Sequence, residues 1–248
     1  MKGIKSKSYG LFICGLVLSA GDAIGNPQQD KFNAGLAALE RQHYATAVRA
    51  WSEIATSGSP TAQNNLGLLY EQGLGVTQNF VSAMEWYEKA EEAGSLEATH
   101  NIGMLYVNGK GVSKSWSRAL HYFSKVEIDL PDSRYMVGLS YFQGEGQIQN
   151  RPLAFKRFLS SALNGYGPAQ YMTAFMYLDG KDVERSVLQG YAWAKLASLG
   201  EADVIPVDEL LIVAESQLSH DDTSRANLIV SQCTTYGMSA CKEGLSAL

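Results

Sequence analysis

The thirteen residues NNLGLLYEQGLGV, at positions 64–76, decide the fold, because three later stretches repeat their pattern. The later copies are HNIGMLYVNGKGV at 100–112, YMVGLSYFQGEGQ at 135–147 and YMTAFMYLDGKDV at 171–183. All four align without a gap, at offsets of 36, 35 and 36 residues. A fixed period of this length is typical of chains built from stacked supersecondary units.

Each copy begins with a helical pattern. In the first copy Ala62, Leu66, Leu69 and Tyr70 recur at i, i+4, i+7 and i+8, so they share one stripe of a helix. A small residue at one position predicts a close approach of the neighbouring helix. The positions in register are the small residues Gly67, Gly103, Gly138 and Ala174, the tyrosines Tyr70, Tyr106, Tyr141 and Tyr177, and the glycines Gly73, Gly109, Gly144 and Gly180.

Paired glycines then predict the end of each of these helices. Gly73 and Gly75 follow the first stripe, and glycine takes the left-handed conformation at a helix end without steric cost. The second and third copies keep both glycines, whereas the fourth has Asp182 at the second position. Because the same glycine-rich turn recurs between helices, helix termination explains it better than phosphate binding does.

A second amphipathic stretch follows each turn. Ala83, Trp86, Tyr87 and Ala90 have the i, i+3, i+4, i+7 spacing of one apolar stripe, with Trp86 expected to be buried between hairpins. Each unit is therefore a helix-turn-helix hairpin. Since one hairpin cannot bury its own stripe, the units must stack into a solenoid.

The combination of Leu-Gly, Tyr, Gly-x-Gly and Ala-x-x-Trp-Tyr at one period resembles the Sel-one-like repeat, a relative of the tetratricopeptide repeat. The resemblance covers roughly residues 60–200 and is best at 62–94. It implies an all-α, right-handed solenoid. We expect a tetratricopeptide-like unit at 26–58, about four Sel-one-like repeats at 59–201, and C-terminal capping helices with a disulfide-closed tail at 202–248.

The first 25 residues have the layout of a secretory signal peptide. Lys2, Lys5 and Lys7 precede an apolar run at 11–20, which small residues follow. Ten apolar residues are too few to span a bilayer, for which about 20 are needed. We therefore expect residues 1–25 to be removed, no transmembrane segment in the mature chain, and a periplasmic or secreted protein.

Two cysteines remain after the expected cleavage. Cys233 and Cys241 lie eight residues apart in the run CTTYGMSAC. An even pair in an oxidising compartment predicts a disulfide, with two unpaired thiols on a mobile tail as the alternative. The spacing differs from the Cys-x-x-Cys of redox catalysts.

The sequence indicates neither a catalytic centre nor a metal or cofactor site. The four histidines are scattered without partners at metal-ligand spacing, and only His100 lies where related solenoids have their inner surface. A net charge of −5 without a Lys/Arg cluster argues against nucleic-acid binding.

Two functions remain from different classes. The first is an exported adaptor that binds a peptide or protein partner on the concave surface, in envelope assembly, secretion or host interaction. The second is a β-lactam-binding or β-lactam-hydrolysing enzyme, by analogy with cysteine-rich Sel-one-like proteins. The second is weaker, because each repeat of those proteins has a cysteine pair and the repeats of this chain have none.

The repeat register predicts which residues line the concave surface. In tetratricopeptide solenoids the residue three before each Gly67-equivalent lies on the inner face, and an apolar patch is expected one turn further towards the C-terminal half. Aromatic groups at such places supply contact area, and polar groups fix orientation. The predicted binding residues are Phe32, Asn64, His100, Tyr135, Phe142, Tyr171 and Leu178.

Overall fold

The computed structural model describes residues 27–200 and 206–248, so the expected signal peptide at 1–25 lies outside the described residues. These residues form 13 α-helices and no strand. The helices are α1 (Pro27–Glu40), α2 (Tyr44–Thr56), α3 (Pro60–Gln72), α4 (Phe80–Glu92), α5 (Leu96–Asn108), α6 (Trp116–Val126), α7 (Pro131–Gln143), α8 (Arg151–Ala162), α9 (Gly167–Asp179), α10 (Val187–Leu199), α11 (Val207–Glu215), α12 (His220–Tyr236) and α13 (Met238–Ser246).

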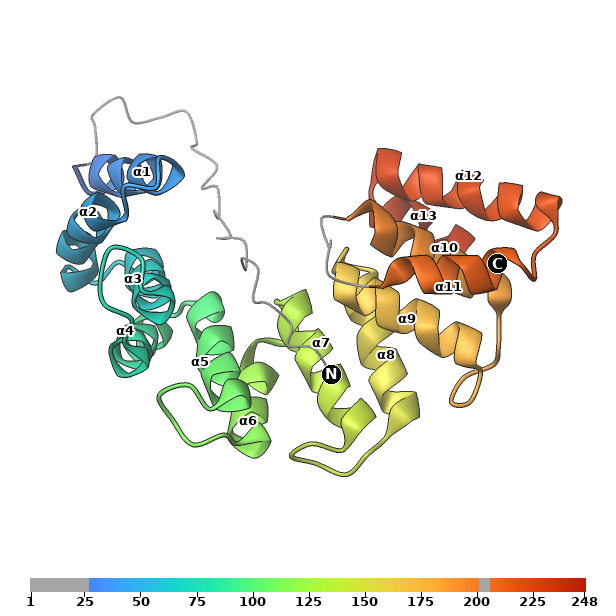
Figure 1. The fold of residues 1–248 in the computed structure, drawn as a ribbon, viewed down its shortest axis with the longest axis horizontal. Coiled ribbons are helices and arrows are strands. Elements are labelled where there is room, and N and C mark those ends of the chain that lie inside the picture. The colour runs from blue at the N-terminus through green and yellow to red at the C-terminus, as the bar shows by residue number, and fades with distance from the viewer. Residues whose placement is uncertain (1–26, 201–205) are drawn as a thin grey trace.

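The helices from α1 to α10 pack as successive hairpins. Each odd-numbered helix contacts the even-numbered helix that follows it, and that helix contacts the next hairpin. The hairpins stack side by side into an arc, with α1 and α2 at one end and α11 to α13 at the other (Figure 1). The expectation of an all-helical solenoid is confirmed.

The turn inside each repeat is closed by the same backbone hydrogen bond. The amide of Asn79 donates to the carbonyl of Tyr70 at 2.9 Å, and the equivalent bonds of the next three units measure 2.9, 2.9 and 3.1 Å. Gly73 ends α3 with a φ of 71°, a left-handed conformation that glycine adopts freely. The turn is therefore a local property of each unit.

The second glycine of the first three turns has a different role, because it lies against the preceding hairpin. A Cβ on Gly75 would come within 2.4 Å of the backbone carbon of Tyr44, at the start of α2. Gly111 and Gly146 meet the starts of α4 and α6 in the same way. Only a residue without a side chain permits this approach.

In the fourth repeat an ion pair replaces that close approach. Asp182 stands where the second glycine would be, and its Oδ2 accepts a hydrogen bond of 2.6 Å from Nε of Arg151. Arg151 is the first residue of α8, the equivalent of Tyr44 in α2. The departure that is visible in the sequence is therefore compensated in the preceding hairpin.

The small residue in each first helix faces an aromatic ring of its own second helix. A Cβ on Gly67 would lie 2.5 Å from the ring of Tyr87, and one on Gly103 would lie 2.5 Å from the ring of Phe123. Gly138 meets Phe158 in the same way. In the fourth repeat the ring is absent: Ala194 stands at that position, and the glycine is replaced by Ala174.

The buried member of the aromatic pair differs from our expectation. Tyr87 has no exposed surface, whereas Trp86 is only partly buried and packs against the core of the preceding hairpin. The Tyr87 hydroxyl donates a 2.9 Å hydrogen bond to Glu71, and burial, followed by the Glu71 charge, raises the pKa of Tyr87 well above its ordinary value. Tyr87, and not Trp86, is the central packing residue of this hairpin.

The C-terminal end closes the solenoid with three helices. Ser219 caps α12, since its hydroxyl accepts a hydrogen bond from the amide of Asp222. Whereas α11 packs on α10 as the next repeat would, α12 packs back on α10 and on α13. Residues after Tyr236 form a further short helix, α13.

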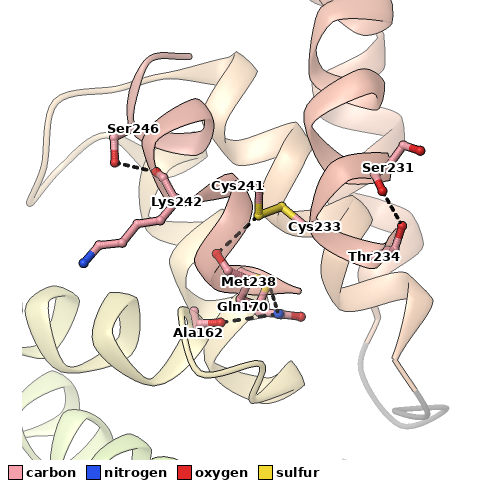
Figure 2. The surroundings of a disulfide bond; sticks show 9 residues. All are labelled: Ala162, Gln170, Ser231, Cys233, Thr234, Met238, Cys241, Lys242 and Ser246. Carbon is pink, nitrogen blue, oxygen red and sulfur yellow. Dashed lines mark hydrogen bonds between the residues drawn. A yellow bond between two sulfur atoms is a disulfide. The ribbon is translucent and has the colours of Figure 1, made fainter. Parts of the chain in front are cut away.

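The predicted disulfide is formed and joins the last two helices. Cys233, in α12, is bonded to Cys241, in α13, and both side chains are buried (Figure 2). On the same side of α13, Met238 lies close to Gln170 at the start of α9 (Figure 2). The bridge therefore holds α13 against the end of the repeat array.

Candidate functional site: the inner face of the arc

In the arc, α3, α5 and α7 lie towards the inside, and α4, α6 and α8 lie towards the outside (Figure 1). We call the surface formed by α3, α5, α7 and α9 the inner face. The seven predicted binding residues lie on these helices or, for Phe32, on α1.

The first two predicted residues serve the packing of the hairpins. Phe32 stacks on Trp51 with ring centroids 6.0 Å apart, and its carbonyl accepts a hydrogen bond from the Trp51 indole. Asn64 is only 7% exposed, and its Oδ1 accepts a 2.9 Å bond from Nδ2 of Asn101 in the next hairpin. Asn64 therefore joins two hairpins instead of offering an open polar group.

His100 likewise lies at a junction between hairpins. Its Nδ1 is 2.8 Å from Oγ of Ser133 in α7, and its ring packs at 5.3 Å on Phe123. Its Nε2 lies 3.6 Å from a carboxylate oxygen of Asp132. Burial lowers the pKa of His100 below its ordinary value, against the opposing effect of the Asp132 charge.

The grouping of Ser133, His100 and Asp132 has the residue types of a hydrolytic triad, but its geometry does not suit one. The Ser133 side chain has no exposed surface, so a substrate carbonyl cannot reach its hydroxyl. A nucleophile must be in contact with the bond that it attacks. These three residues hold α5 to α7, and the enzymatic alternative gains no support from them.

The third repeat presents an aromatic group on the inner face. Tyr135 is partly buried and packs on Phe158 at 5.5 Å and on Tyr166 at 5.3 Å. Phe142 packs on Phe158, and the guanidinium of Arg151 lies 4.1 Å from its ring centroid. Among the predicted residues, this pair comes closest to the expected apolar patch.

In the fourth repeat the two predicted residues differ in their surroundings. Tyr171 is partly buried at the edge of the C-terminal core, and burial, then the charge of Glu209 in α11, raises its pKa. Leu178 packs against α10, because its Cδ2 lies 2.6 Å from where a Cβ on Gly190 would be. The glycine at 190 therefore makes room for Leu178.

One row of inner-face residues was not predicted. Directly after the small residue of each repeat stands a large apolar side chain that is only partly buried. This row, the inner strip, consists of Leu68, Met104, Leu139 and Phe175. Its signal in the sequence was an apolar residue at a fixed register position outside the buried stripe.

Charge is divided between the two sides of the arc. The four fully described inner helices α3, α5, α7 and α9 contain four carboxylates and one cation, Arg134. The outer helices α4, α6, α8 and α10 contain four carboxylates, all in α4, and seven cations. The inner face is therefore acidic and apolar, and the outer side beyond α4 is basic.

Neither a metal site nor a membrane span is found in the part of the chain that the structure describes. Within residues 27–200 and 206–248, no three His, Cys, Asp or Glu side chains are grouped to hold a metal ion. Over the same residues, no helix combines the length and the apolar character that crossing a membrane requires.

The fold and its inner face define a helical-repeat protein of the solenoid class. The chain belongs to the Sel1 repeat family, which matches residues 60–95, 96–125, 131–166 and 167–200, more than half of its length. Sel1 repeat proteins are generally protein-interaction scaffolds, and the fold is typically not enzymatic. No curated protein sequence matches the chain.

Solved structures share the fold at low sequence identity. A Sel1 repeat protein from Oxalobacter formigenes is 22% identical, with a TM-score of 0.71 over 85% of this chain and 89% of that one. A protective antigen of uropathogenic Escherichia coli with an SLR fold is also 22% identical, with a TM-score of 0.64 over 84% of this chain and 49% of that one. At this identity the likeness shows the fold alone.

Proposed function

We propose that this chain is an exported adaptor that binds a peptide or protein segment along the inner face of α5, α7 and α9. The observation that carries the proposal is the inner strip, continued by Tyr135 and Tyr171. These large apolar and aromatic side chains are only partly covered. Such side chains are the usual anchors of protein interfaces.

Photo-crosslinking tests where the partner binds. A benzophenone amino acid replaces Leu139 or Phe175 on the inner strip, and Val81, which is 56% exposed on the outer helix α4, serves as the control position. We expect one partner to be captured from the inner positions and not from Val81. Capture from Val81 alone would contradict the proposal.

Affinity for the captured partner tests the anchors. Tyr135→Ala and Tyr171→Ala should each weaken binding of the purified partner by about 1 to 3 kcal/mol, as truncated interface aromatics do. Calorimetric titration gives the affinity, and far-ultraviolet circular dichroism checks that the helices are intact. A doubly substituted protein that binds as tightly as the parent would rule out the inner face.

Export is the part of the proposal that rests on the sequence. Basic, apolar and small residues follow one another in the first 25 positions. We expect the mature chain to begin between Gly21 and Gln28, and N-terminal sequencing of the protein from the cell envelope or medium measures this. A functional protein that retains Met1 would refute export by cleavage.

A further inference from the structure

The acidic character of the inner face indicates what kind of segment it takes, provided that the proposed function holds. The only cation in α3, α5, α7 and α9, all fully described, is Arg134. Its guanidinium donates hydrogen bonds to the backbone carbonyls of Ile128 and Ser160. Arg134 is therefore engaged in packing, and its guanidinium is directed at these two carbonyls.

Two of the four inner carboxylates already have a lysine partner. Glu71 pairs with Lys110 at 2.9 Å, and Asp179 pairs with Lys181. Glu97 accepts a hydrogen bond from the Ser95 hydroxyl beside it. These three groups are thus explained by contacts within the chain.

Among the described residues, Asp132, like Glu97, has no cation beside it at neutral pH, and its Oδ1 accepts a 2.7 Å hydrogen bond from the Ser133 amide. Its side chain is 29% exposed, and the basic group beside it is His100. Since burial lowers the pKa of His100, the imidazole is neutral at pH 7 and leaves the carboxylate charge uncompensated. Tyr135 follows Asp132 by three residues, so the carboxylate and the aromatic ring lie on the same side of α7.

A carboxylate also lies near an aromatic side chain in the next repeat. Glu209 is exposed near the start of α11, which packs beside α9. Its negative charge is close enough to Tyr171 to raise the pKa of that hydroxyl. A carboxylate beside an aromatic ring is the combination that recognises a Lys or Arg side chain, through an ion pair and a cation–π contact.

We propose that the inner face binds a cationic, apolar segment of a partner protein. The apolar side chains of that segment pack on the inner strip. One Lys or Arg side chain lies between Asp132 and Tyr135, and a second lies between Glu209 and Tyr171. The basic outer helices support a positive charge on the bound segment, because an acidic segment would be attracted to the outer side of the arc.

Fluorescence anisotropy with synthetic peptides tests the proposal. The probe is a fluorescein-labelled twelve-residue peptide of leucine and arginine, compared with peptides that have citrulline or glutamate in place of every arginine. The protein variants are Asp132→Asn and Glu209→Gln, which remove a charge and keep the shape. Glu85→Gln on the exposed outer side of α4 is the matched control.

We expect the arginine peptide to bind at least about tenfold more tightly than the citrulline peptide, and the glutamate peptide not to bind. Asp132→Asn and Glu209→Gln should each weaken the arginine peptide about fivefold and leave the citrulline peptide unchanged, while Glu85→Gln has no effect. Equal binding of the arginine and citrulline peptides, or equal effects of Asp132→Asn and Glu85→Gln, would overturn the inference.

The experiments distinguish failure of the cationic-segment inference from failure of the proposed function. If the arginine peptide binds no better than the others but the captured partner still depends on Tyr135 and Tyr171, the cationic segment is excluded and the inner face remains the site. If crosslinks form only from Val81, the inner face itself is excluded and the cationic segment with it.

Discussion

At the scale of single residues, the repeats keep their geometry by matching a small side chain with a large one. Gly67 leaves the space that the ring of Tyr87 fills, and the same relation holds for Gly103 with Phe123. In the fourth repeat both partners change together, to Ala174 and Ala194. The glycine is thus kept where a ring lies against it and is lost where the ring is lost.

The buried ring should be the more sensitive of the adjacent aromatic residues. Tyr87→Ala removes a fully buried side chain and should lower the free energy of unfolding by about 3 to 5 kcal/mol, whereas partly buried Trp86→Ala should cost about half as much. Lys110→Ala removes a partly exposed ion pair with Glu71 and a cation–π contact with Phe80, and should cost about 1 kcal/mol. Urea denaturation measures all three, and a larger loss for Trp86→Ala would contradict the packing described.

His100 should make the protein less stable in mild acid. Its pKa in the folded protein lies below the ordinary value of about 6.5, so the unfolded chain takes up the proton first as the pH falls. The groups that face the ring are Asp132 and Ser133 of α7 and Phe123 of α6. The free energy of unfolding should therefore decrease from about pH 6.5 downward, as the pH approaches the lowered pKa.

The variant His100→Gln isolates this effect, because glutamine can hydrogen-bond to Ser133 and does not titrate. Urea denaturation at pH 7.5 and at pH 5 should show a smaller loss of stability for the variant than for the parent. Equal losses would mean that other groups, and not His100, account for the acid sensitivity.

The sequence predicted the packing positions better than the contacts between hairpins. The spacing of Gly67, Tyr70 and Gly73 was sufficient, because helical periodicity and helix ends are local properties. The bond from Asn101 to Asn64 and the approach of His100 to Ser133 join residues 37 and 33 positions apart. They depend on the rotation between neighbouring hairpins, which no local pattern encodes.

At the scale of elements, local sequence patterns were least informative about the C-terminal helices. Capping helices and a disulfide-closed tail were expected at 202–248, but no pattern marked α13 as a separate helix, and its nine residues include Gly244 and follow Gly237. Such a short helix has little stability of its own. Its place depends on packing against α12, on the bond from Gln189 to the Leu245 carbonyl, and on the disulfide.

Removal of the disulfide should therefore loosen α13 first. We expect a chain with Cys233→Ser and Cys241→Ser to lose about 2 to 3 kcal/mol, on the chain-entropy model of a short closed loop. Hydrogen exchange at 238–246 should accelerate far more than exchange in α5 or α7, which serve as internal controls. Unchanged protection of α13 in the double variant would show that packing alone holds it.

At the scale of the whole molecule, the arc separates two kinds of surface on one thin scaffold. The helices of the inner face have apolar side chains and more carboxylates than cations, and the outer side beyond α4 is rich in Lys and Arg. The net charge of −5 does not reveal this division, because it says nothing about how the charged residues are distributed. The division becomes visible once each helix is assigned to the inner or the outer side. The assignment follows from the repeat register, so the charge pattern was available in the sequence once the hairpins were recognised.

The four turns also determine how the arc bends. At three of them the second glycine is wedged against the backbone of the preceding hairpin, so the hairpins cannot slide past each other without a steric clash. At the fourth, the contact is a partly buried ion pair between Asp182 and Arg151, which salt weakens. The array of hairpins should therefore resist bending at the first three turns and bend more easily at the fourth turn, which follows α9. Small-angle scattering should find the curvature independent of salt in a protein with Arg151→Met, and slightly reduced by salt in the parent.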